Sequence, residues 1–286
     1  MMIVMVVLGH RPASFGWSRP TIGIVGREGK AVDGFVVHDV AAEVVVRIRR
    51  AMPELSPETE AAVERLWQAA SHRVAAGGAG RLFNGRVFSI DAITPYLVTG
   101  HLTEFRRIVA QMEQPELFPV LGVRPLAVCG VLHCAGGVVV GRRHRGAIYQ
   151  AGMWQLAPAG SVDAGAVRDD GVIDLRRQLL AELQEELGLS PDMVGEPRPL
   201  CIMEHPGSHV ADFGLALTSD LTAEAVLAVH RVGGNAEYQE LLVVPDDRLE
   251  AFLAEAGETL VPPAREFLVR AGLTHREPSR PPDSPA

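Results

Sequence analysis

The segment LRRQLLAELQEELGL, residues 175–189, constrains the fold more than any other part of the chain. Its pattern predicts an α-helix over 175–187 with one strongly apolar side. That side consists of Leu179, Leu180, Leu183 and Leu187. Gly188 is suited to the left-handed conformation that ends many helices. We therefore expect a helix that packs its leucines against a core and ends sharply at Gly188.

A neighbouring side of the same helix is acidic. Glu182, Glu185 and Glu186 stand at positions i, i+3 and i+4, where like charges destabilise a helix by roughly 0.2–0.5 kcal/mol per pair. Such a side is most often simply solvated. Three carboxylates within reach of one point also suit a hard divalent cation such as Mg²⁺. The helix taken alone favours the solvated reading.

The composition limits the classes of function. The chain has 286 residues, is 47% hydrophobic and carries a formal net charge of −8, which gives it no long-range attraction for nucleic acid or for an anionic membrane. Its three cysteines form no paired framework, so we expect a reduced, cytoplasmic setting. The apolar start, residues 1–10, is too short to span a membrane and predicts a buried strand.

Short β-branched runs and helical patterns alternate along the chain. We expect strands at 22–25, 34–40, 83–90, 96–100, 213–221 and 238–245, and a β-hairpin from 124–134 and 138–143. We expect helices at 57–74, 102–112, 246–257 and 262–272, the first with Ser56 as its N-cap. His205 and His209 flank a Pro-Gly-Ser turn, which predicts a surface loop.

The loop WQLAPAGSVDAG, residues 154–165, follows a strand and leads toward the acidic helix. Strand, glycine loop and a helix with E-x-x-E-E before a closing glycine together resemble the Nudix box of the Nudix hydrolase family, with Gly160 opening the motif. Two positions depart from that box, because Ala166 stands where it has a glutamate and Ala181 where it has an arginine. The segment VRDDGVI, residues 167–173, is an insertion between the two halves.

The chain resembles the Nudix UDP-glucose pyrophosphatases in three features. These are an inserted loop in the box, the absence of the same glutamate and arginine, and an N-terminal extension. The segments ERLW, FNGRVFSI, LGVRPLAV and the C-terminal P-x-A-R helix stand in the same order. This resemblance implies an α+β protein. It predicts a Nudix α/β/α sandwich with a mixed sheet over 119–275, a smaller N-terminal α+β domain over 1–118 that helps to wall the substrate cleft, and a disordered tail over 276–286.

The resemblance also implies roles for particular residues. Mg²⁺ (or Mn²⁺) would be the cofactor, and a further acid from a later strand would join the helix carboxylates, with Glu237 preferred over Glu240 and Asp212. The implied metal ligands are Glu182, Glu185, Glu186 and Glu237, of which Glu182 and Glu186 are also the catalytic candidates. The substrate-binding candidates are Gly160, Arg143 and Arg145, although the two arginines also fit an exposed, solubilising turn.

The expected activity is metal-dependent hydrolysis of a nucleoside diphosphate linked to another moiety, with a nucleotide sugar such as UDP-glucose as the leading substrate. The expected partner is thus a small molecule, with neither nucleic acid nor membrane, and whether the chain forms a homodimer is left open. Ala166 and Ala181 support the main alternative, an inactive Nudix-fold module that binds a nucleotide or a protein. A pyrophosphatase acting on ADP-ribose or a dinucleotide is the third reading.

Overall fold

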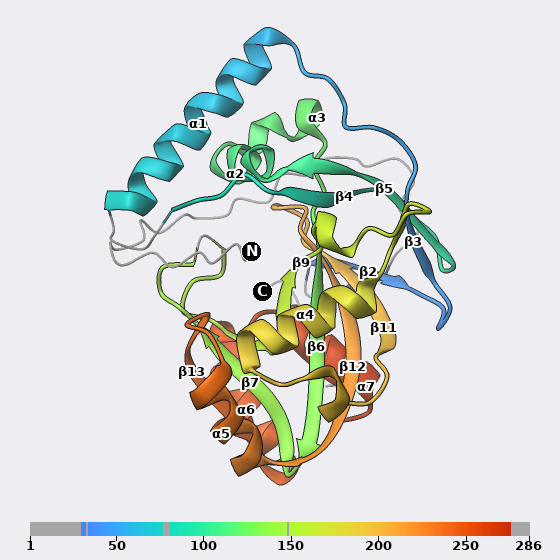
Figure 1. Cartoon of the computed structure of the whole chain (residues 1–286), viewed down its shortest axis with the longest axis vertical. Coiled ribbons are helices and arrows are strands. Elements are labelled where there is room, and N and C mark those ends of the chain that lie inside the picture. The colour runs from blue at the N-terminus through green and yellow to red at the C-terminus, as the bar shows by residue number, and fades with distance from the viewer. Residues whose placement is uncertain (1–29, 33, 77–80, 148, 276–286) are drawn as a thin grey trace, which may run out of the picture.

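The computed structural model describes residues 30–32, 34–76, 81–147 and 149–275. Within them the strands form two sheets, with helices on both faces of the larger one (Figure 1). The strands expected at 1–10 and 22–25 and the tail at 276–286 lie outside the described residues. None of the helices in the described ranges is long and apolar enough to cross a membrane.

The larger sheet is mixed, as expected. Its order is β1-β2-β11-β12-β6-β7-β13, with β8 paired to β7 and β9 paired to β6. Its strands are β1 (Lys30–Val32), β2 (Phe35–Asp39), β6 (Leu126–Ala135), β7 (Gly137–Arg143), β8 (Trp154–Leu156), β9 (Ala159–Ser161), β11 (Arg198–Glu204), β12 (Ala211–Thr222) and β13 (Tyr238–Val244). The central pair, β12 and β6, is parallel, whereas the other pairs of this sheet are antiparallel.

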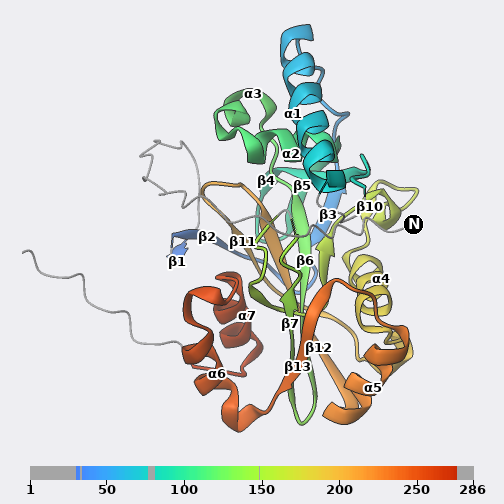
Figure 2. The same cartoon turned by 90° about the vertical axis from the view of Figure 1, so that its left-hand side faces the viewer.

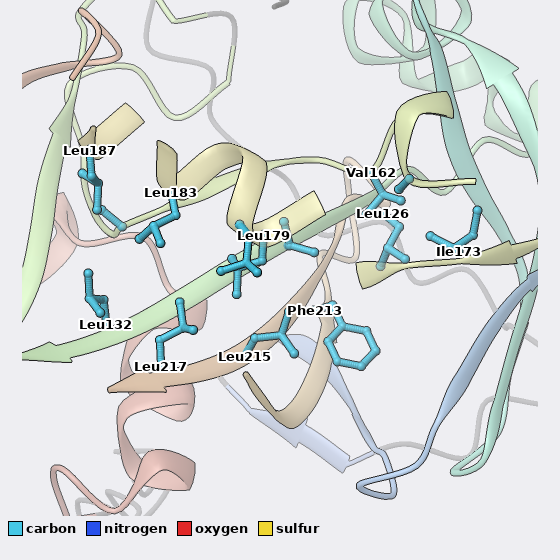
Figure 3. Close-up of a cluster of buried hydrophobic side chains, with 14 of the residues drawn as sticks. Leu126, Leu132, Val162, Ile173, Leu179, Leu183, Leu187, Phe213, Leu215 and Leu217 are labelled. Carbon is cyan, nitrogen blue, oxygen red and sulfur yellow. The ribbon is translucent and has the colours of Figure 1, made fainter. Parts of the chain in front are cut away.

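Two hydrophobic cores cover the two faces of this sheet. On one face, α4 (Leu175–Leu187) and α5 (Ala223–Gly233) pack on the sheet, and the leucines of α4 meet Leu126, Leu132 and Leu215 (Figure 3). On the other face, α6 (Leu249–Ala256) and α7 (Pro263–Ala271) pack with Leu253 and Phe267 (Figure 2). Because both faces are buried under helices, this part of the chain is an α/β/α sandwich.

The smaller sheet and three helices lie at one end of the sandwich (Figure 1). Its order is β10-β3-β5-β4. These elements are β3 (Val45–Ile48), β4 (Arg86–Ile93), β5 (Leu97–Glu104), β10 (Val172–Ile173), α1 (Pro57–Ala76), α2 (Phe105–Glu113) and α3 (Phe118–Leu121). Ser56 caps α1 as expected, because its Oγ accepts a hydrogen bond from the Thr59 amide at 3.2 Å.

The strand pairing crosses residue 118 in both directions. β2 precedes this residue yet pairs with β11 of the larger sheet, whereas β10 follows it yet pairs with β3 of the smaller sheet. The division into domains at 118 therefore stays a prediction. Several elements were not expected, namely β1, β3, β8, β9, β10, β11, α3 and α5. Residues 102–104 belong to β5 and not to the following helix.

Candidate active site

The acidic helix α4 is fixed at both ends. The Asp174 side chain caps it by accepting a hydrogen bond from the Arg177 amide at 2.9 Å. At the other end Gly188 has a φ of +73°, and its N–H donates to the Gln184 carbonyl at 3.1 Å. A Cβ at Gly188 would lie 2.8 Å from the carbonyl carbon of Gly233, so only glycine fits there. The predicted stop at Gly188 is thus confirmed.

The acidic side of α4 borders a cavity of about 420 Å³. Carboxylates dominate its charged lining, which consists of Asp163, Glu182, Glu185, Glu186, Asp212 and Glu237 with Arg143 and Arg177. Phe105, Ile108 and Met112 of α2 supply an apolar wall. The smaller, N-terminal part of the molecule therefore contributes to the same cavity as the sandwich.

Glu186 is the most deeply buried carboxylate of this lining, with 4% of its surface exposed. Its Oε2 accepts two hydrogen bonds, one from the Tyr238 hydroxyl at 2.7 Å and one from the Ala159 amide at 3.0 Å. Burial, followed by the charge of nearby Glu182, raises the pKa of Glu186 well above its usual range. The Ala159 contact binds α4 directly to the bend before Gly160.

Glu182 lies against the same bend. A Cβ on Gly160 would be 2.2 Å from the Glu182 Cδ, so the glycine leaves the space that this carboxylate occupies. Glu182 Oε1 accepts a hydrogen bond from Gln178 Nε2 at 2.8 Å. Burial, assisted by repulsion from Glu185, Asp163 and Glu237, raises the pKa of Glu182 to about 7.

The remaining acids surround this pair from other elements. Glu185 is exposed on α4, and Glu237, just before β13, lies with Oε1 3.7 Å from Arg143 Nη2. Asp212, near the start of β12, also lines the cavity, and burial raises its pKa to about 7. Glu240 is exposed and does not belong to the lining. Of the later acids, Glu237 and Asp212 therefore reach the cavity.

The carboxylates of α4 have separate hydrogen-bond partners. Within the described ranges, no group of three or more His, Cys, Asp or Glu side chains is arranged to hold a metal ion. Glu186 turns to Tyr238 and Ala159, while Glu182 turns to Gln178. The assignment of metal ligands stays a prediction.

Of the two arginine candidates, Arg143 reaches the cavity and Arg145 does not. Arg143 lines the cavity but is bound to the protein, because its Nη1 donates to Gln155 Oε1 at 2.8 Å and its Nε to the Tyr149 carbonyl at 3.1 Å. Arg145 is exposed and is not among the lining residues. Arg177 lines the cavity, and no ion pair to it occurs in the described part of the chain. The sequence alone could have indicated Arg177, because it stands one helical turn before Ala181, where the Nudix box has an arginine.

The two alanines of the degenerate motif have different surroundings. Ala166 is buried in the core of the sandwich and also lines the cavity, where its methyl group offers no atom that could bind a cation. Ala181 is exposed and lines the cavity beside Glu182 and Glu185. The side of α4 that faces the cavity thus presents an alanine between Arg177 and the carboxylates.

No protein-family model matches the sequence, and no curated protein matches it. Solved structures do share parts of the fold. A MutT protein from Methanosarcina mazei Go1 is 18% identical over 53% of this chain and 96% of its own, with a TM-score of 0.38. A Nudix hydrolase from M. smegmatis, RenU, is 18% identical over 55% and 91%, with a TM-score of 0.36. An Ap4A hydrolase from C. elegans is 16% identical over 52% and 98%, with a TM-score of 0.32. Likenesses at this level do not by themselves assign a function.

Proposed function

We propose that the protein is a Nudix-type hydrolase that requires a divalent cation and cleaves the diphosphate of a nucleoside diphosphate linked to another moiety. A nucleotide sugar such as UDP-glucose is the leading substrate class. One observation carries the proposal: Glu182 and Glu186 pack against the bend at Ala159 and Gly160, at the edge of one acidic cavity. The motif that resembles a Nudix box is therefore assembled in space as well as in sequence.

The residues of this cavity fit a hard divalent cation such as Mg²⁺ or Mn²⁺. Carboxylate oxygens are the ligands that such ions prefer, and six of the charged lining residues are acidic against two arginines. Burial raises the pKa values of Glu182, Glu186 and Asp212 together, which marks negative charge that the protein itself leaves uncompensated. Glu182, Glu185, Glu186 and Glu237 are the proposed ligands, with Asp212 as a further candidate.

The chemistry of diphosphate cleavage explains why these groups would be gathered. A bound divalent cation would neutralise charge on the phosphoryl oxygens and make a water molecule more nucleophilic. Arg177 and Arg143 would contact the phosphates, because guanidinium groups match phosphate oxygens in geometry and charge. The apolar wall of Phe105, Ile108 and Met112 would exclude water from one side and contact an uncharged part of the substrate.

A second candidate is a Nudix-fold module that binds a nucleotide without hydrolysing it. Ala166 favours it, since it lines the cavity at the position where the Nudix box has a glutamate, and a methyl group cannot bind a cation. Against it stand the six acids of the lining, which would repel a nucleotide phosphate unless a cation were bound. Hydrolysis of ADP-ribose or of a dinucleotide would use the same acids and differ only in the surrounding contacts.

The proposal is tested by turnover. We expect the wild-type protein to release a nucleoside monophosphate from UDP-glucose, ADP-ribose or Ap4A only when Mg²⁺ or Mn²⁺ is present. Glu186→Gln should lower kcat by roughly 100-fold or more, because it removes a carboxylate that acts in the reaction and is not needed for folding. Glu255→Gln, on the exposed surface of α6, is the matched control and should retain full activity.

Two results would count against hydrolysis. Binding of these nucleotides without cation-dependent turnover would identify the binding module. Equal activity of Glu186→Gln and wild type, with both variants folded, would remove α4 from the reaction.

A further inference from the structure

A chain of buried hydrogen bonds runs across three neighbouring strands to Glu186. Arg143 at the end of β7 donates to Gln155 Oε1 at 2.8 Å. Gln155 on β8 donates through Nε2 to the Tyr238 hydroxyl at 3.0 Å, and Tyr238 at the start of β13 donates to Glu186 Oε2 at 2.7 Å. Gln155, Tyr238 and Glu186 are 5%, 6% and 4% exposed. Water therefore competes little for the two bonds that join Gln155, Tyr238 and Glu186.

The direction of every bond in this chain is determined by its first member. A guanidinium group only donates hydrogen bonds, so the Gln155 side-chain oxygen must face Arg143 and its NH₂ group must face Tyr238. The Tyr238 oxygen then accepts from Gln155, which leaves its own hydrogen for Glu186. Neither the amide nor the hydroxyl can reverse without breaking a bond to Arg143 or leaving a buried donor unpaired.

The backbone holds the tyrosine ring in place for this task. Tyr238 crosses β7 at Gly141, where a Cβ would lie 2.3 Å from the ring. Gly141 is also the residue that pairs with Gln155 across β7 and β8. A side chain at this position would displace the ring, so the glycine keeps Tyr238 between Gln155 and the helix.

Both hydrogen bonds to Glu186, from Tyr238 and from the Ala159 amide, end on Oε2. With this oxygen anchored from two sides, rotation of the carboxylate is blocked, and Oε1 is the oxygen left to bind a cation. We propose that Tyr238 is a positioning residue: its hydroxyl, oriented by Gln155 and Arg143, holds Glu186 so that Oε1 is presented to a divalent cation. The inference rests on the proposed function and adds the residues that prepare its central carboxylate.

The experiment compares Tyr238→Phe, which removes only the hydroxyl, with wild type and with Tyr96→Phe, whose side chain is 64% exposed. Mn²⁺ binding is measured by calorimetry without substrate, and kcat and KM are measured on UDP-glucose or on whichever substrate of the panel is turned over. Tyr238→Phe should weaken Mn²⁺ binding and lower kcat, each by roughly 10- to 100-fold, as is typical when the partner of a metal ligand is lost. KM should stay within about two-fold. Tyr96→Phe should match wild type in all three.

A double-mutant cycle with Gln155→Met tests whether Gln155 acts through Tyr238. The single variant should weaken Mn²⁺ binding, and the double variant should be no weaker than Tyr238→Phe alone. Should Tyr238→Phe fail to fold, Gln155→Met tests the same chain of bonds one residue further from Glu186.

The outcomes separate the two proposals. If wild type binds Mn²⁺ and hydrolyses a diphosphate while Tyr238→Phe equals it in Mn²⁺ affinity and kcat, the positioning role is overturned and the proposed function stands. A loss of thermal stability in Tyr238→Phe with unchanged Mn²⁺ affinity would likewise reduce Tyr238 to a structural residue. If wild type neither binds Mn²⁺ nor turns over any substrate, the proposed function itself is overturned.

Discussion

Two neighbouring arginines on α4 have opposite surroundings. Arg176 donates through Nε to Glu196 at 2.9 Å on the surface, whereas Arg177 lines the acidic cavity. An exposed ion pair such as the first contributes roughly 0–1 kcal/mol. Arg177 is the arginine of this pair that we propose to contact the phosphates of a substrate.

Replacement of these two arginines gives a matched pair of variants. Arg177→Ala should raise KM for a nucleoside diphosphate substrate by roughly 10-fold or more, since a hydrogen bond to a charged group contributes about 1.5–3 kcal/mol. Arg176→Ala should leave KM unchanged. Steady-state kinetics at two salt concentrations checks this, and an equal KM for both variants would remove Arg177 from phosphate binding.

At the scale of elements, Glu204 at the end of β11 joins several parts of the fold. It is fully buried and receives two hydrogen bonds from Arg124, at 3.0 and 2.7 Å. His38 of β2 and His209 each place a ring nitrogen 3.6 Å from its oxygens. Burial opposes the charge, but the contacts with His209, His38 and Arg124 prevail and lower the pKa of Glu204 far below its usual range.

This lowered pKa predicts how stability depends on pH. A group whose pKa is lower in the folded protein stabilises it above the unfolded pKa, about 4.3 for glutamate, and loses that contribution as the pH falls toward the folded pKa. Glu204→Gln should therefore cost about 3–5 kcal/mol at pH 7, since it leaves Arg124 without its charged partner. That cost should shrink steadily below about pH 4.3.

Urea unfolding of wild type and Glu204→Gln between pH 7 and pH 3 measures the effect. A difference in stability that stays constant over this range would show that the Glu204 charge is not the stabilising feature. Glu54→Gln, on an exposed segment before α1, is the control and should show no difference at either end of the range.

The elements differ in how well their sequences predict them. The leucines of α4 recur at helical spacing, and the apolar runs of β6 and β7 flank a glycine turn that indicates a hairpin, so all three elements were predicted and are confirmed. β11 has buried residues on both sides and a proline near its start, and it therefore lacks the alternation that indicates a strand. His209 was expected on a surface loop but is buried and stacks on Phe118, with 3.5 Å between ring centroids. Contacts between distant segments decided these cases.

The site shows the same division. Carboxylates on one side of a helix follow from spacing, so the sequence could place Glu182 and Glu186 together, and both line the cavity. The roles that we propose for Tyr238, Gln155 and Arg177 depend on strands and turns that meet only in three dimensions. Arg145 was selected because it follows β7, but the turn after that strand carries it away from the cavity.

At the scale of the whole molecule, the sandwich is not closed by residues 119–275 alone. β2 pairs with β11 at the sheet edge, and Phe35 and Val37 belong to the core beneath α7. A fragment of 119–275 would therefore expose the edge of β11 and this apolar surface. We expect the fragment to aggregate or to lack a cooperative thermal transition that the full chain shows. A cooperative transition at an unchanged temperature, measured by circular dichroism, would establish 119–275 as an independent domain.

The inserted segment connects the acidic helix α4 to the smaller sheet. β10 ends at Ile173, Asp174 caps α4 immediately afterwards, and β10 itself is paired to β3. The start of the acidic helix is therefore attached to the smaller sheet. Because Glu182 lies about two helical turns from this attachment, we expect a tilt of the smaller sheet to move Glu182. Shortening the insertion to the length of an ordinary Nudix box would remove the connection between α4 and the smaller sheet. All the carboxylates would remain in the chain, but the start of their helix would no longer be held by β10.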